Sequence, residues 1–148
     1  WPGRSRNQVS YVSHTGQEEG RMTKATGGCY CGEIRYELSG EAELQLFCFC
    51  EDCRKFCGTD GYAGYMVLDD NFKHTRGTPT QHRTISAEGR TVTRNFCSVC
   101  GSLCWGATEL GLTSVAAGTL DDPDIFQPSM NVFEEQAPHW AHIPKHEI

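Results

Sequence analysis

Residues 91–105 read TVTRNFCSVCGSLCW, and this stretch combines two strand-like runs with a cysteine turn. The runs at 91–96 and 103–105 alternate with the period of two that is typical of a β-strand. Between them, Cys97 and Cys100 have the two-residue spacing of a metal-binding turn, and Gly101 can adopt the positive φ that such turns often need. The stretch therefore predicts two strands that meet at a metal ion.

The same alternation recurs along most of the chain, at 34–38, 44–46, 62–68 and 112–120. Turn-forming Gly, Asp, Asn and Pro residues separate these runs, at 39–40, 69–71, 77–79, 88–89 and 121–123. Such short spacings suit antiparallel connections rather than helical crossovers. Helical turns fit only near 51–57 and 122–127. The sequence predicts one mostly β domain of antiparallel sheets, with metal ions holding it together.

The first 26 residues differ from the rest of the chain. They are polar and lack periodicity, so we expect residues 1–26 to be a flexible leader. Met22 begins a segment with the form of a native N-terminus, and residues 1–21 are therefore expected to be a non-native extension. The structured domain is expected over 27–148, which is within the size of one ordinary domain.

The composition argues against two classes of partner. The 13 Lys and Arg residues against 19 Asp and Glu residues give a formal net charge of −6, the wrong sign for a general nucleic-acid binder. No apolar run approaches the ~18 residues that cross a bilayer, and no signal peptide is visible. We therefore expect a cytoplasmic protein that binds neither nucleic acid nor a membrane.

Nine cysteines are the strongest chemical signal in the 148 residues. In a chain without export signals they are expected to be reduced, and clustered reduced cysteines are typical of metal sites. A disulfide framework is the alternative, but an odd number of cysteines and two Cys-x-Cys pairs suit it less well. Seven cysteines form three groups: Cys29 and Cys31; Cys48, Cys50 and Cys53; Cys97 and Cys100.

Seven thiolates divide naturally into a set of four and a set of three. Zinc is tetrahedral, so four protein ligands close a structural site, whereas three leave a position for water or substrate. This division gives a closed site on Cys29, Cys31, Cys97 and Cys100, and an open site on Cys48, Cys50 and Cys53. Two closed sites, with Cys57 as the additional ligand, are the alternative. Iron in a four-thiolate site is a weaker alternative to zinc.

The remaining cysteines, histidines and aromatic residues are expected to have structural roles. Cys57 can reach the ion bound near Cys53, but we favour packing as a small hydrophobe, and Cys104 is expected to be a buried thiol. No histidine has a ligand spacing to the cysteines, so surface or hydrogen-bonding roles are expected, and a catalytic Cys–His pair is the alternative. Core positions are expected for four aromatic residues that could otherwise line a pocket for a larger substrate: Tyr62, Tyr65, Phe72 and Trp105.

Together these residues resemble the glutathione-dependent formaldehyde-activating enzyme family, which includes centromere protein V-like members. The matching segments are GCYCG at 28–32 with Ile34-Arg35-Tyr36, CFCEDCRK at 48–55, RNFCSVCG at 94–101 and GTLDDP at 118–123. The resemblance runs from residue 28 to about residue 144. The order and spacing of all seven clustered cysteines match, which is far more specific than any single pair.

The resemblance implies a β-tent fold with two zinc ions. A structural zinc would lie on Cys29, Cys31, Cys97 and Cys100, and a catalytic zinc on Cys48, Cys50 and Cys53. The activity that gives the family its name adds glutathione to formaldehyde, which makes it a carbon–sulfur lyase acting in the synthetic direction. Members often carry histidine where this chain has Phe49, which changes the polarity beside the catalytic site.

This chemistry suits an open, thiolate-rich zinc site. A thiol bound at the fourth position loses its proton and lies beside the carbonyl carbon. An anionic thiol needs positive charge nearby, because the site itself is negative. Arg54 and Lys55 are therefore predicted to bind the carboxylates of the thiol, with Arg90 and Arg94 behind them. Two readings compete with this one: a related zinc enzyme acting on a larger metabolite, and a non-catalytic zinc-stabilised binding module.

Overall fold

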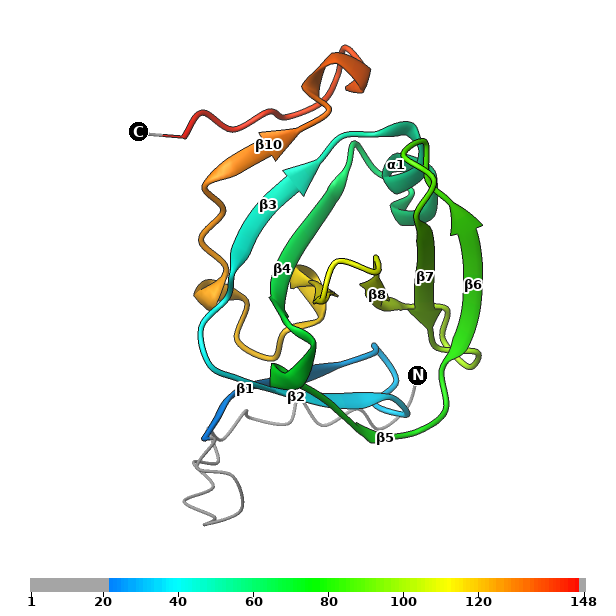
Figure 1. Ribbon diagram of the computed structural model, residues 1–148, viewed down its shortest axis with the longest axis vertical. Helices are drawn as coiled ribbons and strands as arrows, with labels where there is room; N and C mark the ends of the chain where they lie inside the picture. Colours follow the sequence, from blue (N-terminus) through cyan, green and yellow to red (C-terminus); the bar gives the residue numbers. More distant parts are fainter. Residues whose placement is uncertain (1–21, 147–148) are drawn as a thin grey trace.

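The computed structural model describes residues 22–146, which form two β-sheets and one short α-helix (Figure 1). The smaller sheet has the order β1-β2-β5, with bounds Thr23–Gly28, Arg35–Ser39 and Phe72–Arg76. The larger sheet has the order β10-β3-β4-β9-β8-β7-β6. Its strands span Met130–Val132, Leu44–Cys48, Tyr62–Leu68, Leu112–Ala116, Leu103–Ala107, Thr91–Phe96 and Thr80–Ile85.

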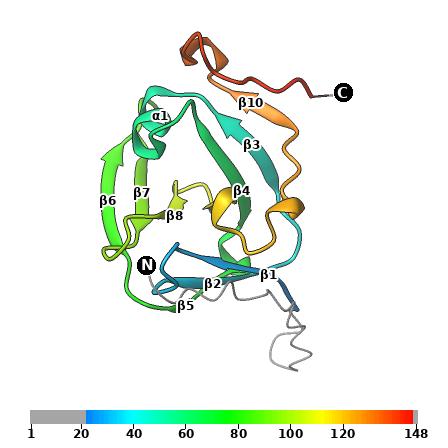
Figure 2. The same ribbon diagram turned by 180° about the vertical axis from the view of Figure 1, so that it is seen from behind.

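The sheets are arranged like a base with two arms (Figures 1 and 2). The smaller sheet lies across the lower end, and the larger sheet rises from it, with β3 and β4 on one side and β6 and β7 on the other. Helix α1, Glu51–Cys57, lies between these arms at the upper end. Short 3₁₀ turns cover Asp69–Asn71, Ala117–Thr119, Pro123–Ile125 and Glu134–Gln136. No helix over residues 22–146 is both long and apolar enough to cross a membrane.

The core lies between the two sheets. Tyr36 and Leu38 face inward from β2, and Val67, Trp105 and Val115 face them from the larger sheet; all five are buried. The ring of Tyr36 stacks on Phe72 at a centroid distance of 5.6 Å, and its hydroxyl is hydrogen-bonded to Thr119 Oγ1 at 2.7 Å. Burial of these aromatic and branched side chains is the main force that holds the smaller sheet on the larger one.

Most of the predicted elements are confirmed. Strands β4 and β7 have the predicted bounds, α1 occupies the predicted helical turn at 51–57, and the turn at Pro123–Ile125 lies within the predicted 122–127. The predicted positive φ of Gly101 is also present, at 81°. In β4, Tyr65 and Val67 of one face are buried, whereas Met66 and Leu68 of the other face are more exposed, as period-two patterning predicts. In β7 both faces are partly covered, since Arg94 and Asn95 are both buried.

The first strand begins earlier in the chain than predicted. Residues 23–26 were expected in the leader, but β1 begins at Thr23 and pairs with β2 along its length. Ala25 is buried and its two neighbours are half-buried. The strand, TKATGG, was not predicted because it has almost no hydrophobic side chains that could show a period of two. Residues 1–21, the expected non-native extension, lie outside the described residues. The division of the chain into leader and domain stays a prediction.

Three further strands were not predicted, and one of them changes the type of sheet. Strands β5 and β6 are mostly exposed and polar, and β10 has only three residues. Strand β10 pairs with β3 in parallel, so the larger sheet is mixed rather than wholly antiparallel. These strands are specified by pairing with their neighbours rather than by their own hydrophobic pattern.

Candidate metal centres

The four-cysteine set is assembled from the end of β1 and the turn between β7 and β8. The sulfurs of Cys29, Cys31, Cys97 and Cys100 all lie within 4.8 Å of one another. The Cys29 and Cys31 sulfurs are 3.6 Å apart, and those of Cys31 and Cys97 are 3.7 Å apart. Four sulfurs at about 2.3 Å from a tetrahedral zinc ion are separated by about 3.8 Å. The donor type and the spacing of this set therefore fit zinc.

Backbone and side-chain donors surround the four-cysteine set. The N–H groups of Ile34 and Val99 donate to the sulfurs of Cys29 and Cys97 at 3.2 and 3.4 Å. Ser102 Oγ lies 3.2 Å from the Cys100 sulfur and accepts from the Tyr30 N–H at 3.0 Å. Such hydrogen bonds favour charged thiolates and fix the orientation of the ligands. Ser102 was not singled out in the sequence, because its role depends on the approach of Tyr30 from 72 residues away.

The three-cysteine set lies at the other end of the molecule, where β3 leads into α1. The sulfurs of Cys48, Cys50 and Cys53 lie within 4.8 Å of one another. Cys48 is buried at the end of β3, Cys50 is the N-cap of α1, and Cys53 is in the first turn of the helix. The structure thus brings together the three residues predicted to form an open site, and three thiol donors at this spacing fit zinc.

Local interactions explain why so short a helix forms at this point. The Cys50 sulfur accepts from the Cys53 N–H at 3.3 Å, as an N-cap oxygen would, and acidic Glu51 and Asp52 occupy the first turn. The side chain of Gln136 accepts from the Glu51 N–H at 3.0 Å. At the other end, Gly58 takes the left-handed conformation with φ 67° and donates to the Arg54 carbonyl. Helix caps therefore hold Cys50 and Cys53 with their sulfurs close together.

The three thiols strongly influence one another's ionisation. Hydrogen bonds from Cys48 and Cys53 lower the pKa of Cys50 to about 2. The hydrogen bond to Cys50 raises the pKa of Cys48 to about 11, and hydrogen bonds with Cys48 and Cys50 also raise the pKa of Cys53. The three sulfurs therefore compete for negative charge, and Cys50 is the one whose thiolate form is favoured. A divalent cation would displace the remaining protons, as is usual for thiolate sites.

The two other cysteines lie outside both sets. Cys104 is fully buried, and desolvation raises its pKa to about 12, which confirms the prediction of a buried thiol. Cys57 is half-buried, and burial raises its pKa although Arg94 acts in the opposite direction. It does not join the compact three-sulfur set. All nine cysteines are free thiols, in agreement with reduced cysteines rather than a disulfide framework.

One face of the larger sheet is directed toward the three-cysteine set. Cys48 pairs with Tyr62, and a cross-strand row joins Ser114, Gly106, Arg94 and His82 on that same face. Arg94 lies 4.0 Å from the ring centroid of Phe56, which shares a face of α1 with Cys53 and Cys57. The guanidinium therefore lies over a residue that follows Cys53, a predicted ligand, by about one helical turn.

Arg94 is the basic residue of this face that is nearly buried. It is 9% exposed and donates to Thr84 Oγ1 at 3.2 Å. The ion pairs found over residues 22–146 join Lys24 to Glu41, Arg35 to Asp121 and Arg90 to Glu88, and Arg94 takes part in none of them. A nearly buried cation without a carboxylate partner is costly unless an anion approaches it.

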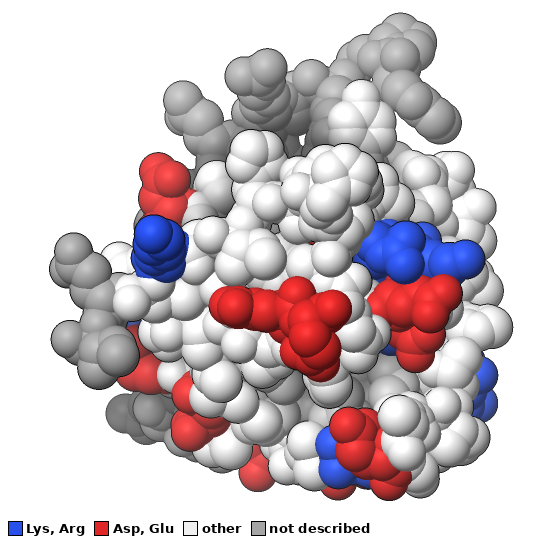
Figure 3. Space-filling view, turned by 90° about the horizontal axis from the view of Figure 1, so that it is seen from above, with Lys and Arg blue, Asp and Glu red and all other residues white. Residues whose placement is uncertain are grey.

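The predicted basic residues on α1 are more exposed than Arg94. Arg54 is half-buried and its Nε has no hydrogen-bond partner, whereas Lys55 is exposed. On the face seen from above, acidic side chains gather across the middle and basic side chains lie beside them (Figure 3). Glu51 and Asp52 lie in the first turn of the same helix and weaken the field of its two basic residues. Phe49 is 1% exposed and packs away from solvent.

The aromatic residues considered for a pocket divide between two environments. Tyr65 is buried in the core, and Tyr62 is hydrogen-bonded to Ser114 Oγ at 2.9 Å on the face of the three-cysteine set. Phe72 and Trp105 pack on the core and also line a groove on the opposite face of the larger sheet. The prediction of core positions is thus confirmed for Tyr65 and Trp105, while Phe72 and Tyr62 are half-buried.

Comparisons with known proteins agree with this arrangement. The fold is similar to that in a crystal structure of a Rhodobacter sphaeroides protein, with a TM-score of 0.53 and 18% identity over 71% of this chain and 98% of that one. A family model described as glutathione-dependent formaldehyde-activating enzyme matches residues 24–136, which include all seven clustered cysteines. The chain belongs to the glutathione-dependent formaldehyde-activating enzyme family.

Proposed function

We propose that the protein is a zinc-dependent carbon–sulfur lyase that acts in the synthetic direction. It would join a glutathione-like thiol to formaldehyde or another small carbonyl at Cys48, Cys50 and Cys53. The observation that carries the proposal is the separation of seven thiols into a four-sulfur set and a three-sulfur set. Three protein ligands leave one position of a tetrahedral ion for the substrate. The description of the family names both glutathione and formaldehyde.

Two zinc ions are part of this proposal, a structural ion on the four-cysteine set and a catalytic ion on the three-cysteine set. The catalytic ion would supply a position at which a thiol loses its proton at neutral pH. In the reaction, the sulfur forms a bond to the carbonyl carbon and the π bond of the carbonyl breaks. The thiol proton ends on the carbonyl oxygen, so the product is a hydroxymethyl thioether and no oxidant is needed.

The residues of the chain hold and orient the reactants. Cys48, Cys50 and Cys53 are fixed by the end of β3 and the first turn of α1, so the open position has a defined direction. Arg54 and Lys55 remain proposed contacts for the carboxylates of the thiol. Arg94 joins them as the best placed, because it is nearly buried, lies over α1 and lacks an acidic partner over residues 22–146. Unpaired thiols at both sets suit a reducing compartment such as the cytoplasm.

Native mass spectrometry of the zinc-loaded chain, with and without glutathione, tests the proposal. The unmodified protein should carry two zinc ions and one glutathione molecule. Cys50→Ser should carry one zinc ion and no glutathione, because serine keeps the N-cap hydrogen bond but removes a sulfur ligand. Cys57→Ser is the matched control on the same helix and should bind like the unmodified protein.

Two results would contradict the proposal. Retention of both zinc ions by Cys50→Ser would show that the three-cysteine set is not a separate metal site. Two zinc ions without any bound thiol, even at millimolar glutathione, would exclude a glutathione-like substrate. That second result would favour either a larger metabolite at the same ion or a zinc-stabilised binding module.

A further inference from the structure

A groove of about 790 Å³ lies on the face of the larger sheet opposite the three-cysteine set. Its floor consists of two cross-strand rows, one with Gln81, Asn95 and Trp105 and one with Arg83, Thr93 and Ala107. Arg94 lies between Thr93 and Asn95 in β7 and so projects to the other face. The groove is therefore a separate feature from the proposed catalytic site, and its volume is within the ~300–1,000 Å³ of typical small-molecule sites.

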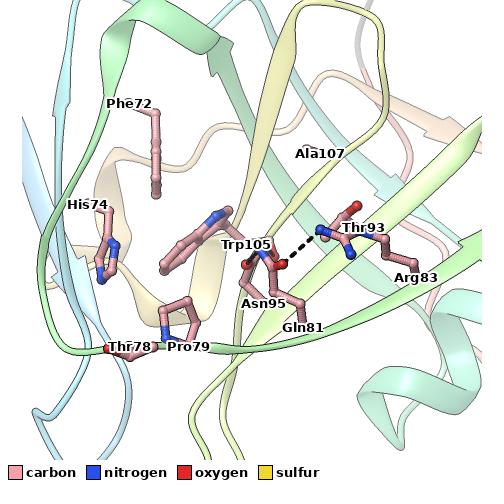
Figure 4. Close-up of a pocket in the computed structure, with 10 residues that line it drawn as sticks. All are labelled: Phe72, His74, Thr78, Pro79, Gln81, Arg83, Thr93, Asn95, Trp105 and Ala107. Atoms are coloured by element: carbon pink, nitrogen blue, oxygen red, sulfur yellow. Dashed lines mark hydrogen bonds between the residues drawn. The ribbon is translucent and has the colours of Figure 1, made fainter.

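One end of the groove is aromatic. Phe72 and His74 of β5 lean over the indole of Trp105, with ring centroids 4.8 and 5.3 Å from it, and Pro79 closes the same end (Figure 4). The His74 ring is held in place by a hydrogen bond between Nε2 and the Arg76 carbonyl at 2.8 Å. Rings fixed in this way offer an apolar wall against which a flat ring can pack.

The other end is polar and its side chains are ordered by a chain of hydrogen bonds (Figure 4). Arg83 Nη2 donates to Gln81 Oε1 at 3.0 Å, Gln81 Nε2 donates to Asn95 Oδ1 at 2.9 Å, and Asn95 Nδ2 donates to the Trp105 carbonyl at 3.3 Å. Each amide oxygen thus already accepts a hydrogen bond. Each amide group keeps one N–H and one oxygen lone pair, whereas the Arg83 guanidinium has donors only, five in all. The end therefore presents mainly donors.

The charged residue that lines the groove is basic, which suits an anion as the surplus of donors does. The chain has 19 Asp and Glu residues, yet none is among the ten residues that line the groove. Arg83 forms none of the ion pairs found over residues 22–146. A donor-rich, basic end beside an aromatic wall is complementary to an anion that carries a flat apolar body.

We propose that this groove is a second binding site, for a small planar aromatic carboxylate. The ring packs against Trp105, His74 and Phe72, and the carboxylate accepts hydrogen bonds from Arg83 and the side-chain amides of Gln81 and Asn95. The proposal does not depend on the catalytic function, because the two sites lie on opposite faces of the sheet.

The test uses naphthalene-2-carboxylate as the probe and the zinc-loaded full chain. In a ¹⁵N NMR titration we expect shifts of the Trp105 indole N–H and of the Gln81 and Asn95 side-chain amides. The neutral carboxamide of the same ring should bind about tenfold more weakly, since one charge-assisted hydrogen-bonded contact is lost. Arg83→Gln should weaken binding of the carboxylate by a similar factor but leave binding of the carboxamide nearly unchanged.

Two further variants complete the design. Arg90→Gln, the matched control, removes the same charge outside the groove and should bind the carboxylate like the unmodified chain. Ala107→Leu adds a larger side chain to the floor of the groove and should weaken the binding of both probes. Equal affinity of Arg83→Gln and the unmodified chain for the carboxylate would overturn the proposal, as would an absence of shifts at the three groove residues. Zinc and glutathione binding at the three-cysteine set is measured separately. Failure of this proposal would therefore leave the proposed function intact, and failure of the proposed function would leave this proposal intact.

Discussion

At the scale of single residues, Arg94 links the sheet to the helix that carries the three-cysteine set. Its guanidinium lies over Phe56, donates to Thr84 and lacks an ion-pair partner over residues 22–146. Its field lowers the pKa of the Cys57 thiol, against the larger effect of burial. An anionic substrate that enters here gains the interaction of a nearly desolvated cation, which is stronger than that of an exposed lysine.

Arg94→Gln should therefore change the preference between thiols. The Kd of glutathione should rise about tenfold, because a charge-assisted hydrogen bond is worth ~1.5–3 kcal/mol. The Kd of 2-mercaptoethanol, which has no carboxylate, should stay within about twofold. Calorimetric titration of the zinc-loaded protein measures both values. Lys73→Gln, which removes an exposed charge on β5 of the smaller sheet, is the control and should change either Kd by no more than about twofold.

A purely structural role of Arg94 predicts a different result. Loss of its contact with Phe56 would then disturb α1 and weaken the binding of both thiols to the same degree. Arg94→Lys separates the alternatives further, because it keeps the charge but not the planar donor arrangement. It should recover part of the affinity for glutathione.

The sequence predicted which cysteines gather into two sets, but not what surrounds the three-cysteine set, and the reason is physical. Ligand spacing is a local property, so Cys97 and Cys100, or Cys50 and Cys53, can be recognised as pairs along the chain. The position of Arg94 depends on cross-strand register and on the fold of α1 against β7, which no local pattern encodes. For that reason Arg54 and Lys55, adjacent in sequence to Cys53, were ranked above it.

At the scale of elements, helix α1 is too short to be stable by itself. A helix of seven residues lies below the ~12–15 residues at which isolated helices become even marginally stable in water. It is held by the Cys50 cap, the Gln136 side chain and the left-handed Gly58. These contacts position Cys53, so the caps are part of the site as well as of the fold.

Gly58→Ala tests this dependence. The φ of Gly58 is 67°, and a Cβ there would meet no atom within 4 Å, so the cost is conformational and not steric. An L-residue in this conformation costs ~1–2 kcal/mol, and we expect the free energy of unfolding to fall by about that amount. Urea denaturation of the zinc-loaded protein measures it. Gly118→Ala is the matched control, with no positive φ and open space around the Cβ, and should change stability by less than about 0.5 kcal/mol.

A stability of Gly58→Ala equal to that of the unmodified protein would contradict the importance of this cap.

The strands show the same limit of sequence patterns as the site does. Strands β4 and β7 were predicted with their bounds, whereas β1, β5 and β6 were not. Their mixed or exposed side chains lack a hydrophobic period, and their strand conformation comes from hydrogen bonding to neighbouring strands.

At the scale of the whole molecule, the two cysteine sets have different structural consequences. Cys31 and Cys97 are separated by 66 residues, so an ion on the four-cysteine set closes a long loop and ties the smaller sheet to the β7–β8 turn. Cys48, Cys50 and Cys53 lie within one short segment between β3 and α1. By the chain-entropy relation, cross-links at these separations are worth about 4 and about 2 kcal/mol, a difference of about 2 kcal/mol.

Cys100→Ser should therefore destabilise the zinc-loaded protein more than Cys53→Ser, by about 2 kcal/mol in urea denaturation. Both side chains are half-buried, so loss of packing is similar in the two variants and the difference reports on the closed loop. A strong chelator should remove most of this difference, because neither loop is then closed by an ion. Equal loss of stability in the two variants with zinc present would show that the four-cysteine centre does not hold the sheets together. The smaller sheet would then be held by the packing of the shared core around Tyr36 and Trp105.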